Sequence, residues 1–353
     1  MNETIDVCDG GVSGVRGGGI TEFAPGGTPR IVEEPDICSV DDALADAIIA
    51  TVYRVSPPFP PDRALRVEFS IHPVAVGYRE EPWIVWEVTR TADERLSPNL
   101  YWPNRFSRHI GDKAFGLLVA HLVGLPVPRT DVLSRNVAPF NFGTDTGTCD
   151  QWVRTCPRQF SPGEFPTVHG WSDPFAMMAS ADPDGTNIAS VLIQQGVNSQ
   201  WSGAGRTTPD LPEIEGVAGD GDAFMLGQRE PSVLPTMVVE RVRDLLLTAR
   251  DLFGPVRAEW AMDAQQPWLV QLNMTQHVSN VTINAGNARA WLPYNPTTGL
   301  DALRSLIEDA HRDHCGIEVT QPVGLTSHIG DILRDANVPA RFIRSVSDGR
   351  AIA

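Results

Sequence analysis

The sequence predicts a mixed fold of helices and strands, of the α+β or α/β class, and we expect α+β. Apolar residues recur at helical spacing in some stretches and alternate with polar residues in others. No internal repeat is visible, so a solenoid is not expected. At 353 residues the chain can hold two or three domains, each with a core of its own.

The elements begin after a glycine-rich start. Residues 1–37 contain GGVSGVRGGG and PGGTPR, and we expect an irregular lead-in that buries little. Apolar spacing predicts a helix over Asp41–Val55. Two strands, Leu65–His72 and Trp83–Val88, are expected to pair around a turn near Gly77–Pro82.

Helical and strand-like segments then alternate without regularity. Three further helices, each followed by a glycine that we expect to end it, are predicted at Lys113–Val123 (Gly124), Pro235–Phe253 (Gly254) and Leu300–Ala310 (Gly316). Three further strands are predicted at Ile188–Ile193, Ala258–Met262 and Trp268–Leu272. This order without a repeat is what favours the mixed fold class.

Composition excludes several function classes. The formal charge of -16 argues against a nucleic-acid surface, which needs clustered cations. Neither a membrane span nor the layout of a signal peptide is visible, so we expect a cytoplasmic protein without membrane contact. Five scattered cysteines without CxxC spacing predict reduced thiols and no structural zinc site.

One lysine stands among 28 basic residues. Lys113 is the only lysine, and the other 27 cations are arginines. A lysine is a compact point charge that reaches phosphate oxygens end-on, whereas an arginine is a planar fork. Taken alone, the single lysine could equally be the chance product of a strong codon bias.

The surroundings of this lysine carry a resemblance. Neither a G-x-x-x-x-G-K-[ST] loop nor a G-x-G-x-x-G turn after a strand is present. The stretch HIGDKAFGLLVAHLVGLPVPRTDVL, His109–Leu133, resembles the opening of the nucleotide domain shared by phosphoenolpyruvate synthase, pyruvate phosphate dikinase and rifampin phosphotransferase. The resemblance implies a two-lobed, ATP-grasp-like fold and makes Lys113 the ligand of the ATP phosphates, where it would neutralise charge.

Further stretches resemble the same domain in the same order. Within IASVLIQQGVNSQWSGAG, the resemblance places Gln194 at the adenine pocket and Ser202 and Gly203 at a turn. Within IEGVAGDGDAFMLGQREP it retains Glu215 as a nucleotide-binding residue, together with glycines, while Asp222 replaces the usual glutamate.

A closing hairpin supplies the metal ligands that the resemblance implies. RAEWAMDAQQPWLVQLNM, Arg257–Met274, resembles the family hairpin and puts Glu259 and Gln271 on facing strands, where their oxygens would bind Mg²⁺ with ATP. For the second phosphate clamp, Arg154, Arg158 or neither remains open. The resemblance places Gly170 in the loop that covers the phosphates in this family.

The sequence also departs from the family pattern. Arg257 stands where the family often has an acid, and Asn273 stands where it usually has a phosphate-binding arginine. The span from Lys113 to Arg154 is also shorter than is usual in the family. These departures put metal binding and catalysis in question.

A second resemblance lies near the C-terminus. GIEVTQPVGLTSHIGDILRDANVPARFI, Gly316–Ile343, resembles the phosphohistidine segment of the same enzymes. His328 then stands at the start of a helix, where the helix dipole favours a phosphate and a neutral, nucleophilic ring. Thr326 or Ser327 is expected to cap this helix. A structural histidine at a capped strand-to-helix turn is the alternative.

Together these features predict an enzyme that uses ATP and Mg²⁺, with Lys113 and His328 as catalytic residues. The phosphoryl group would pass to His328 or to a small-molecule or protein acceptor. The alternatives are an acyl-phosphate ligase and a non-catalytic ATP-binding module of a larger assembly. The length leaves no room for a phosphoenolpyruvate-binding barrel, so direct phosphoenolpyruvate synthesis is not expected. We expect the lobes at 38–133 and 134–280 and a small α/β segment at 281–353.

Overall fold

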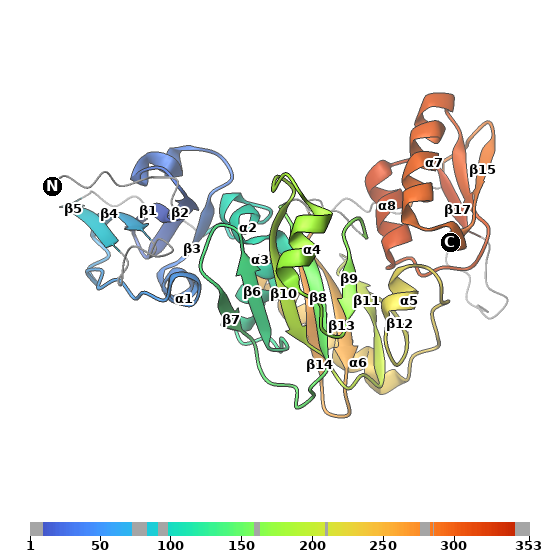
Figure 1. Ribbon diagram of the computed structural model, residues 1–353, viewed down its shortest axis with the longest axis horizontal. Helices are drawn as coiled ribbons and strands as arrows, with labels where there is room; N and C mark the ends of the chain where they lie inside the picture. Colours follow the sequence, from blue (N-terminus) through green and yellow to red (C-terminus); the bar gives the residue numbers. More distant parts are fainter. Residues whose placement is uncertain are drawn as a thin grey trace. The chain divides into compact units, whose positions relative to one another are not determined.

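The computed structural model describes residues 10–72, 83–90, 98–158, 163–208, 211–275, 283–284 and 286–342 (Figure 1). The chain forms two compact units. The first comprises residues 1–160, 166–196 and 271–274, and the second comprises residues 161–165, 197–270 and 275–353. Each unit is described by itself.

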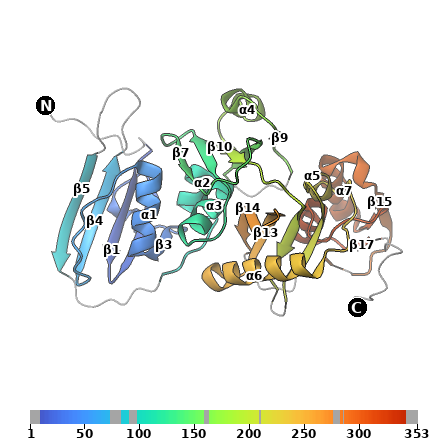
Figure 2. The same cartoon turned by 90° about the horizontal axis from the view of Figure 1, so that it is seen from below.

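The first unit opens with a five-stranded antiparallel sheet, which Figure 2 shows with helix α1 (Asp42–Tyr53) alongside it. Its strands, in sheet order, are β3 (Cys38–Asp41), β2 (Ile20–Pro25), β1 (Val12–Gly17), β4 (Leu65–His72) and β5 (Trp83–Arg90). A short 3-10 helix, η1, spans Pro29–Glu33. The expected helix and strand pair are confirmed, and Asp41 caps α1 by accepting a hydrogen bond from the Leu44 N–H. The turn expected near Gly77–Pro82 lies outside the described residues.

The expectation of an irregular lead-in is wrong for residues 10–37, the part of it that the structure describes. Its glycines allow strand β1 to sit at the centre of the sheet: a Cβ at Gly14 would lie 2.3 Å from the Glu22 carbonyl oxygen and 2.8 Å from the Phe23 Cβ. Gly18 and Gly19 adopt positive φ in the turn between β1 and β2. Glycine therefore provides close packing and a tight turn here, rather than irregular backbone.

The first unit continues with a second five-stranded sheet, again antiparallel. In sheet order its strands are β7 (Phe140–Phe142), β6 (Thr130–Ser134), β10 (Ile188–Gln195), β8 (Gln151–Pro157) and β9 (Thr167–His169). The helices that pack with it are α2 (Arg105–Ile110), α3 (Asp112–Leu122) and α4 (Pro174–Ala181). The predicted helix at Lys113–Val123 and strand at Ile188–Ile193 are confirmed. The boundary expected between residues 133 and 134 falls inside β6.

The second unit contains most of a four-stranded sheet, with α6 (Thr236–Phe253) along it (Figure 2); residues 271–274 of its last strand belong to the first unit. In sheet order the strands are β12 (Glu213–Ala218), β11 (Trp201–Arg206), β13 (Val256–Met262) and β14 (Pro267–Met274), and α5 (Asp222–Met225) follows β12. The predicted helix and both predicted strands are confirmed. The turn expected at Ser202 and Gly203 is wrong, because both residues lie within β11.

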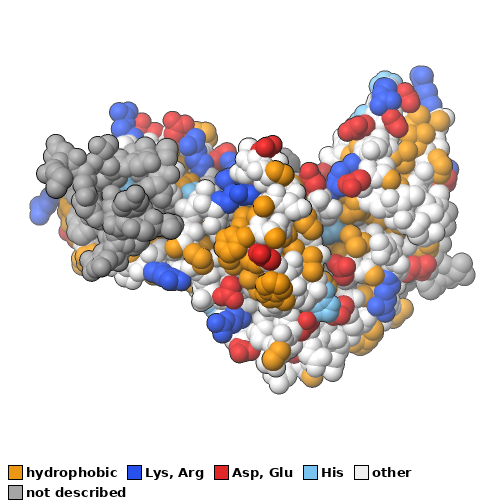
Figure 3. Space-filling model, viewed as in Figure 1, with side chains coloured by type: hydrophobic (Ala, Val, Ile, Leu, Met, Phe, Trp, Pro, Cys, Tyr) orange, Lys and Arg blue, Asp and Glu red, His pale blue; other side chains and the backbone are white. Residues whose placement is uncertain are grey.

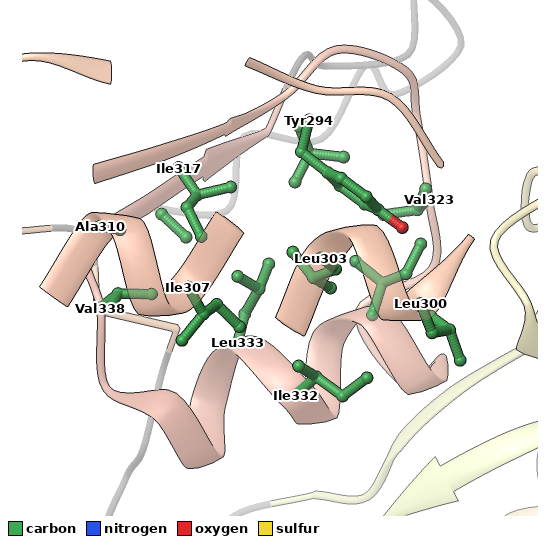
Figure 4. Close-up of a cluster of buried hydrophobic side chains, with 13 residues drawn as sticks. Tyr294, Leu300, Leu303, Ile307, Ala310, Ile317, Val323, Ile332, Leu333 and Val338 are labelled. Atoms are coloured by element: carbon green, nitrogen blue, oxygen red, sulfur yellow. The ribbon is translucent and has the colours of Figure 1, made fainter. Parts of the chain in front are cut away.

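The C-terminal segment of this unit is a small α/β layer. Its parallel strands, in sheet order, are β15 (Trp291–Tyr294), β16 (Gly316–Val319) and β17 (Ala340–Phe342). A 3-10 helix, η2 (Pro296–Thr298), precedes α7 (Leu300–Asp313), and α8 (His328–Ala336) connects β16 to β17. Figure 4 shows the apolar core, in which α7 and α8 pack on the sheet through residues such as Leu303, Leu333 and Ile317, all fully buried. Gly316 does not end α7, since His314 takes the left-handed position after the helix.

The described surface shows a patch of hydrophobic side chains (Figure 3) but no helix suited to crossing a membrane. Among the described residues, no helix combines the length and the apolar character needed to cross a membrane. Figure 3 shows hydrophobic side chains gathered on one face, over the part of the chain labelled α4 in Figure 1. The exposed aromatic residue Phe175 belongs to α4, and the exposed Trp171 lies three residues before that helix.

Candidate functional site

Three of the site's side chains form a row across the second sheet of the first unit. Gln194 on β10 lies directly opposite Trp152 on β8, and Trp152 lies directly opposite His169 on β9. Residues directly opposite in an antiparallel pair project to the same face, with Cβ atoms roughly 5 Å apart. Arg154, two residues beyond Trp152, projects to that face as well.

The same face carries the start of helix α3. The Ser190 hydroxyl donates to the Ile110 carbonyl at 2.6 Å, and the Ala114 N–H donates to Cys156 Sγ at 3.3 Å. Ser190 and Cys156 belong to the face of Gln194 and Arg154 by their register. A Cβ at Gly111 would lie 2.3 Å from Cys156 Sγ, so only glycine permits this approach. The sheet face therefore receives the first turn of α3, which begins with Asp112 and Lys113.

The positive charge of Lys113 acts on the thiol of Cys156, which lies on this face. Burial raises the pKa of the Cys156 thiol to about 11, while the N–H of Ala114 and the positive charge of Lys113 act in the opposite direction. Lys113 is half-buried. Arg154 and Gln194 thus share one face of a single sheet, and the first turn of α3, which carries Lys113, lies against that face; a ligand shared by the three residues stays a prediction.

The side-chain amide of Gln194 is buried, and its nitrogen lacks a hydrogen-bond acceptor among the described residues. Its side chain is 1% exposed, and its Nε2 atom has no hydrogen-bond partner among the described residues. The neighbouring Gln195, on the opposite face, is fully engaged with Asp145, Thr146 and Thr148. Leaving a buried amide donor unsatisfied costs about 1–3 kcal/mol. A ligand with an acceptor atom at this position would recover that energy.

Arg154 and Arg158, the two candidates for the second phosphate-binding arginine, lie in different surroundings. Arg154 lies in the middle of β8, with its guanidinium 5.6 Å from the centre of the Trp152 ring. Arg158 follows the end of β8, and its side chain donates to the Arg108 carbonyl at 3.4 Å. This arrangement favours Arg154 over Arg158 as a ligand. Gly170 ends the β9 edge with φ +85°, and a Cβ there would contact nothing within 4 Å.

Gln271 belongs to the same unit as Lys113. Helix α3 packs closely on β14: a Cβ at Gly116 would lie 2.1 Å from the Leu272 carbonyl oxygen. Gln271 and Asn273 flank Leu272 and are 3% and 8% exposed. Glu259 belongs to the second unit, on the neighbouring strand β13, so the binding of one Mg-ATP by Lys113, at the phosphates, and by Glu259 and Gln271, at the metal, stays a prediction. The described residues contain no cluster of three or more His, Cys, Asp or Glu that could hold a metal.

In the second unit, one face of the four-stranded sheet is lined with charges. Ala204 at the centre lies opposite both Glu215 on β12 and Glu259 on β13, so both carboxylates project to its face. Two residues along the strands, Arg206 lies opposite Glu213 and Arg257 and forms a 2.6 Å ion pair with Glu213. Arg257 and Glu259 are buried.

The loop before α8 is attached to this charged face. Glu215 Oε2 accepts hydrogen bonds from the Thr326 N–H at 2.7 Å and from the Thr326 hydroxyl at 2.9 Å. Ser327 occupies the N-cap position, yet its hydroxyl donates to the Gly324 carbonyl and does not cap the helix. The predicted side-chain cap is therefore wrong, because both hydroxyls have other acceptors. Glu215, expected to bind a nucleotide, here holds this loop.

Helix α8 brings His328 to Arg257. The Arg257 guanidinium lies 3.5 Å from His328 Nδ1 and forms an ion pair with Asp331, one turn further along. Asp331 also pairs with Arg334 at 2.9 Å. An arginine only donates hydrogen bonds, so a hydrogen bond at this contact requires Nδ1 to accept, and a neutral ring then carries its proton on Nε2. Burial raises the pKa of Asp331 to about 6, and the two guanidinium groups oppose that rise.

Several of these residues were not singled out from the sequence. No sequence pattern assigned a role to His169, Trp152, Asp331 or Arg334. The alternation of Trp152, Val153 and Arg154 on a strand, and the three-residue spacing of His328, Asp331 and Arg334 on a helix, were the available signals.

No protein-family model matches this chain, and a comparison with curated proteins finds no match. Among solved structures, D-alanine--D-alanine ligase from Bacillus anthracis complexed with ATP aligns at 12% identity and a TM-score of 0.33, covering 65% of this chain and 66% of that one. The RimK domain protein ATP-grasp from Sphaerobacter thermophilus aligns at 16% and 0.27, covering 49% and 61%. VanG D-Ala:D-Ser ligase from Enterococcus faecalis aligns at 11% and 0.30, covering 47% and 52%. The alignments thus span between about half and two thirds of those chains, and likenesses at this level carry no argument about function.

Proposed function

We propose that this chain is an ATP-dependent enzyme of ATP-grasp-like architecture that transfers a phosphoryl group. The nucleotide would lie on the face that carries Gln194, Arg154 and Lys113. The resemblance of His109–Leu133 to the nucleotide domain of phosphoenolpyruvate synthase and its relatives supports the same assignment.

The observation that carries the proposal is the buried, unpartnered amide of Gln194. Gln194 is 1% exposed, and its Nε2 donor has no hydrogen-bond acceptor among the described residues. A purine ring nitrogen is an acceptor of the right kind, and the base would replace the missing hydrogen bond. Two cations stand on the same face, where the phosphates of such a ligand would need them.

Each residue then has a distinct role. Gln194 would orient the base, while Lys113 and Arg154 would neutralise the phosphate oxygens, most strongly when charge builds up during transfer. The oxygens of Glu259 and Gln271 suit Mg²⁺, which often takes only one or two protein ligands beside substrate phosphates. When bound, the metal would supply further charge neutralisation at those oxygens.

One candidate acceptor is a carboxylate, as in an acyl-phosphate ligase. The carboxylate oxygen would attack the γ-phosphorus, the bond to the β-γ bridging oxygen would break, and ADP would leave. An amine would then attack the acyl carbon and displace inorganic phosphate. Arg154 and Lys113 would serve this transfer in the same way as any other, by stabilising charge.

His328 is the second candidate acceptor, for a specific reason. It opens α8, next to a sheet face that bears Glu215 and Glu259, and its ring faces Arg257. The contact with Arg257 leaves the proton on Nε2, so attack through Nε2 would require the ring to leave Arg257 and exchange that proton. Phosphoryl transfer to His328 therefore predicts movement at this contact.

The nucleotide site is tested by the ATP-dependent rise in melting temperature. Wild type should be stabilised by Mg-ATP, and by about 2.7 kcal/mol when ATP is present at 100 times its Kd. Lys113→Ala and Gln194→Leu should lose most of that shift, whereas Arg158→Ala should keep it. A wild-type protein that is folded and shows no shift with any adenine nucleotide would refute the proposal.

The two acceptors are distinguished with ATP labelled on the γ- or β-phosphate. Transfer to His328 should leave acid-labile label on wild type and none on His328→Ala. A ligase should instead release ADP only when an acceptor is added, and His328→Ala should do so equally well. Tight ATP binding without label or turnover under any acceptor tested would leave a non-catalytic binding module.

A further inference from the structure

An aromatic stack lies beside the proposed nucleotide site, in the first unit. The rings of Trp152 and His169 are stacked with centres 4.4 Å apart and planes 10° apart. His169 Nε2 is 2.7 Å from Asp150 Oδ2, so the imidazole is held at its far end as well. Asp150 lies just before β8, and His169 ends β9, so one hairpin of the sheet edge supplies all three residues.

Trp152 lies between the two groups assigned to the nucleotide. It is the direct cross-strand neighbour of Gln194, and its ring carries the Arg154 guanidinium at 5.6 Å from the ring centre. A guanidinium within about 6 Å of a ring centre is attracted by the electron-rich face of the indole. Since Arg154 and Trp152 are two residues apart on one strand, this contact restricts where the guanidinium can point.

We propose that Trp152 is a positioning residue for Arg154 in the nucleotide site, and that Asp150 and His169 hold the Trp152 ring in place for this purpose. The inference rests on the proposed function, since it assigns a role within the same site. Gln194 would bind the base, and the ring beside it would fix the cation that binds the phosphates.

The physical basis is preorganisation. A free arginine side chain explores many rotamers and loses about 2 kcal/mol of conformational entropy when a phosphate fixes it. A guanidinium that already rests on an indole loses less of this freedom on binding. The Asp150–His169 contact is exposed, so its contribution arises from orientation and not from burial.

The test is the selectivity for phosphates, measured as the ratio of AMP to ATP dissociation constants by calorimetry. Trp152→Ala should weaken ATP binding roughly tenfold while changing AMP binding little, so that the ratio falls. Trp152→Phe should restore most of the ratio because it keeps an aromatic face. His169→Ala should produce a smaller fall in the same direction.

A double-mutant cycle separates positioning from a general loss of structure. Arg154→Ala should lower the ratio, and adding Trp152→Ala should lower it no further, because Trp152 acts through Arg154. Phe175→Ala removes an exposed aromatic residue from α4 in the same unit and should leave the ratio unchanged.

Two failures have different meanings. If wild type binds ATP and Trp152→Ala keeps the wild-type ratio, or if ATP and AMP binding fall equally, Trp152 does not position Arg154 and the inference is overturned. If folded wild type binds no adenine nucleotide, the proposed function itself has failed.

Discussion

Arg257 on β13 forms an ion pair with Asp331 on α8, and their side chains are only 9% and 6% exposed. The same carboxylate pairs with Arg334. One buried acid thus compensates two buried cations, one on the sheet and one on the helix. The charged face of the sheet and the helix that starts at His328 are joined through this carboxylate.

Removing Asp331 should destabilise the second unit strongly. Asp331→Ala would remove the buried carboxylate that pairs with both Arg257 and Arg334, and breaking a buried pair in this way costs about 3–5 kcal/mol. Urea unfolding followed by circular dichroism would measure the loss. Asp301→Ala is the matched control: its pair with Arg304 leaves the Asp301 carboxylate 95% exposed, so little change is expected. Equal stability of the two variants would contradict this account.

Removing the Glu215 carboxylate should loosen the loop before α8. Glu215→Ala removes the acceptor of both Thr326 hydrogen bonds, each to a charged oxygen, and should cost about 2 kcal/mol or more. The rate of limited proteolysis between residues 320 and 336 would report the loosening. Glu213→Ala, on the same strand and 44% exposed, should cleave at the wild-type rate. Unchanged cleavage of Glu215→Ala, with loss of nucleotide binding, would instead return Glu215 to the nucleotide site.

Gly111 should tolerate no side chain. In Gly111→Ala the new Cβ would meet Cys156 Sγ at 2.3 Å, and the residue would also be strained at φ +97°. Such overpacking costs about 1–3 kcal/mol, and moving the start of α3 should weaken ATP binding through Lys113. Gly124→Ala isolates the backbone effect, since Gly124 has φ +91° with nothing within 4 Å of its Cβ. A melting temperature for Gly111→Ala as high as that of Gly124→Ala would show that the clash is relieved elsewhere.

Local patterns in the sequence predicted the regular elements well. Helix α6 and strand β4 follow from the spacing of apolar residues, because each buries one side of a regular element. The glycines were harder to interpret. Gly14 appeared in a glycine-rich run typical of irregular chain, yet it lies in a central strand, because close packing against Phe23 and Phe69 excludes a side chain. Only the partner strands, distant in sequence, reveal this requirement.

The site residues themselves stay predictions. Lys113, Arg154 and Gln194 come from separate stretches of the sequence; in the structure Arg154 and Gln194 share one sheet face, and the first turn of α3, which carries Lys113, lies against it. The partners were not predictable, because Trp152 gains its role from His169 and Asp150 on an adjoining strand and turn. Likewise, Asp331 is one of many acids in the sequence, and only the folded chain shows that it compensates two buried arginines.

Asp112, next to Lys113, should make stability depend on pH. Burial raises its pKa to about 6, while Ser107 and Arg108 act against that rise, and its Oδ2 has no partner among the described residues. Between about pH 4 and pH 6 the folded chain therefore keeps a proton that the unfolded chain releases. A group with a raised pKa stabilises the fold fully at low pH, and this contribution is lost as pH rises through the folded pKa.

A difference measurement isolates this carboxyl from the other acids. The free energy of unfolding of wild type relative to Asp112→Asn should fall by about 3 kcal/mol as pH rises from 4 to 7, since two pKa units correspond to that energy. Urea titrations of both proteins at four pH values in this range would give the difference. A difference that stays constant across the range would mean that Asp112 is ionised in the folded chain, with a counter-charge near the first turn of α3.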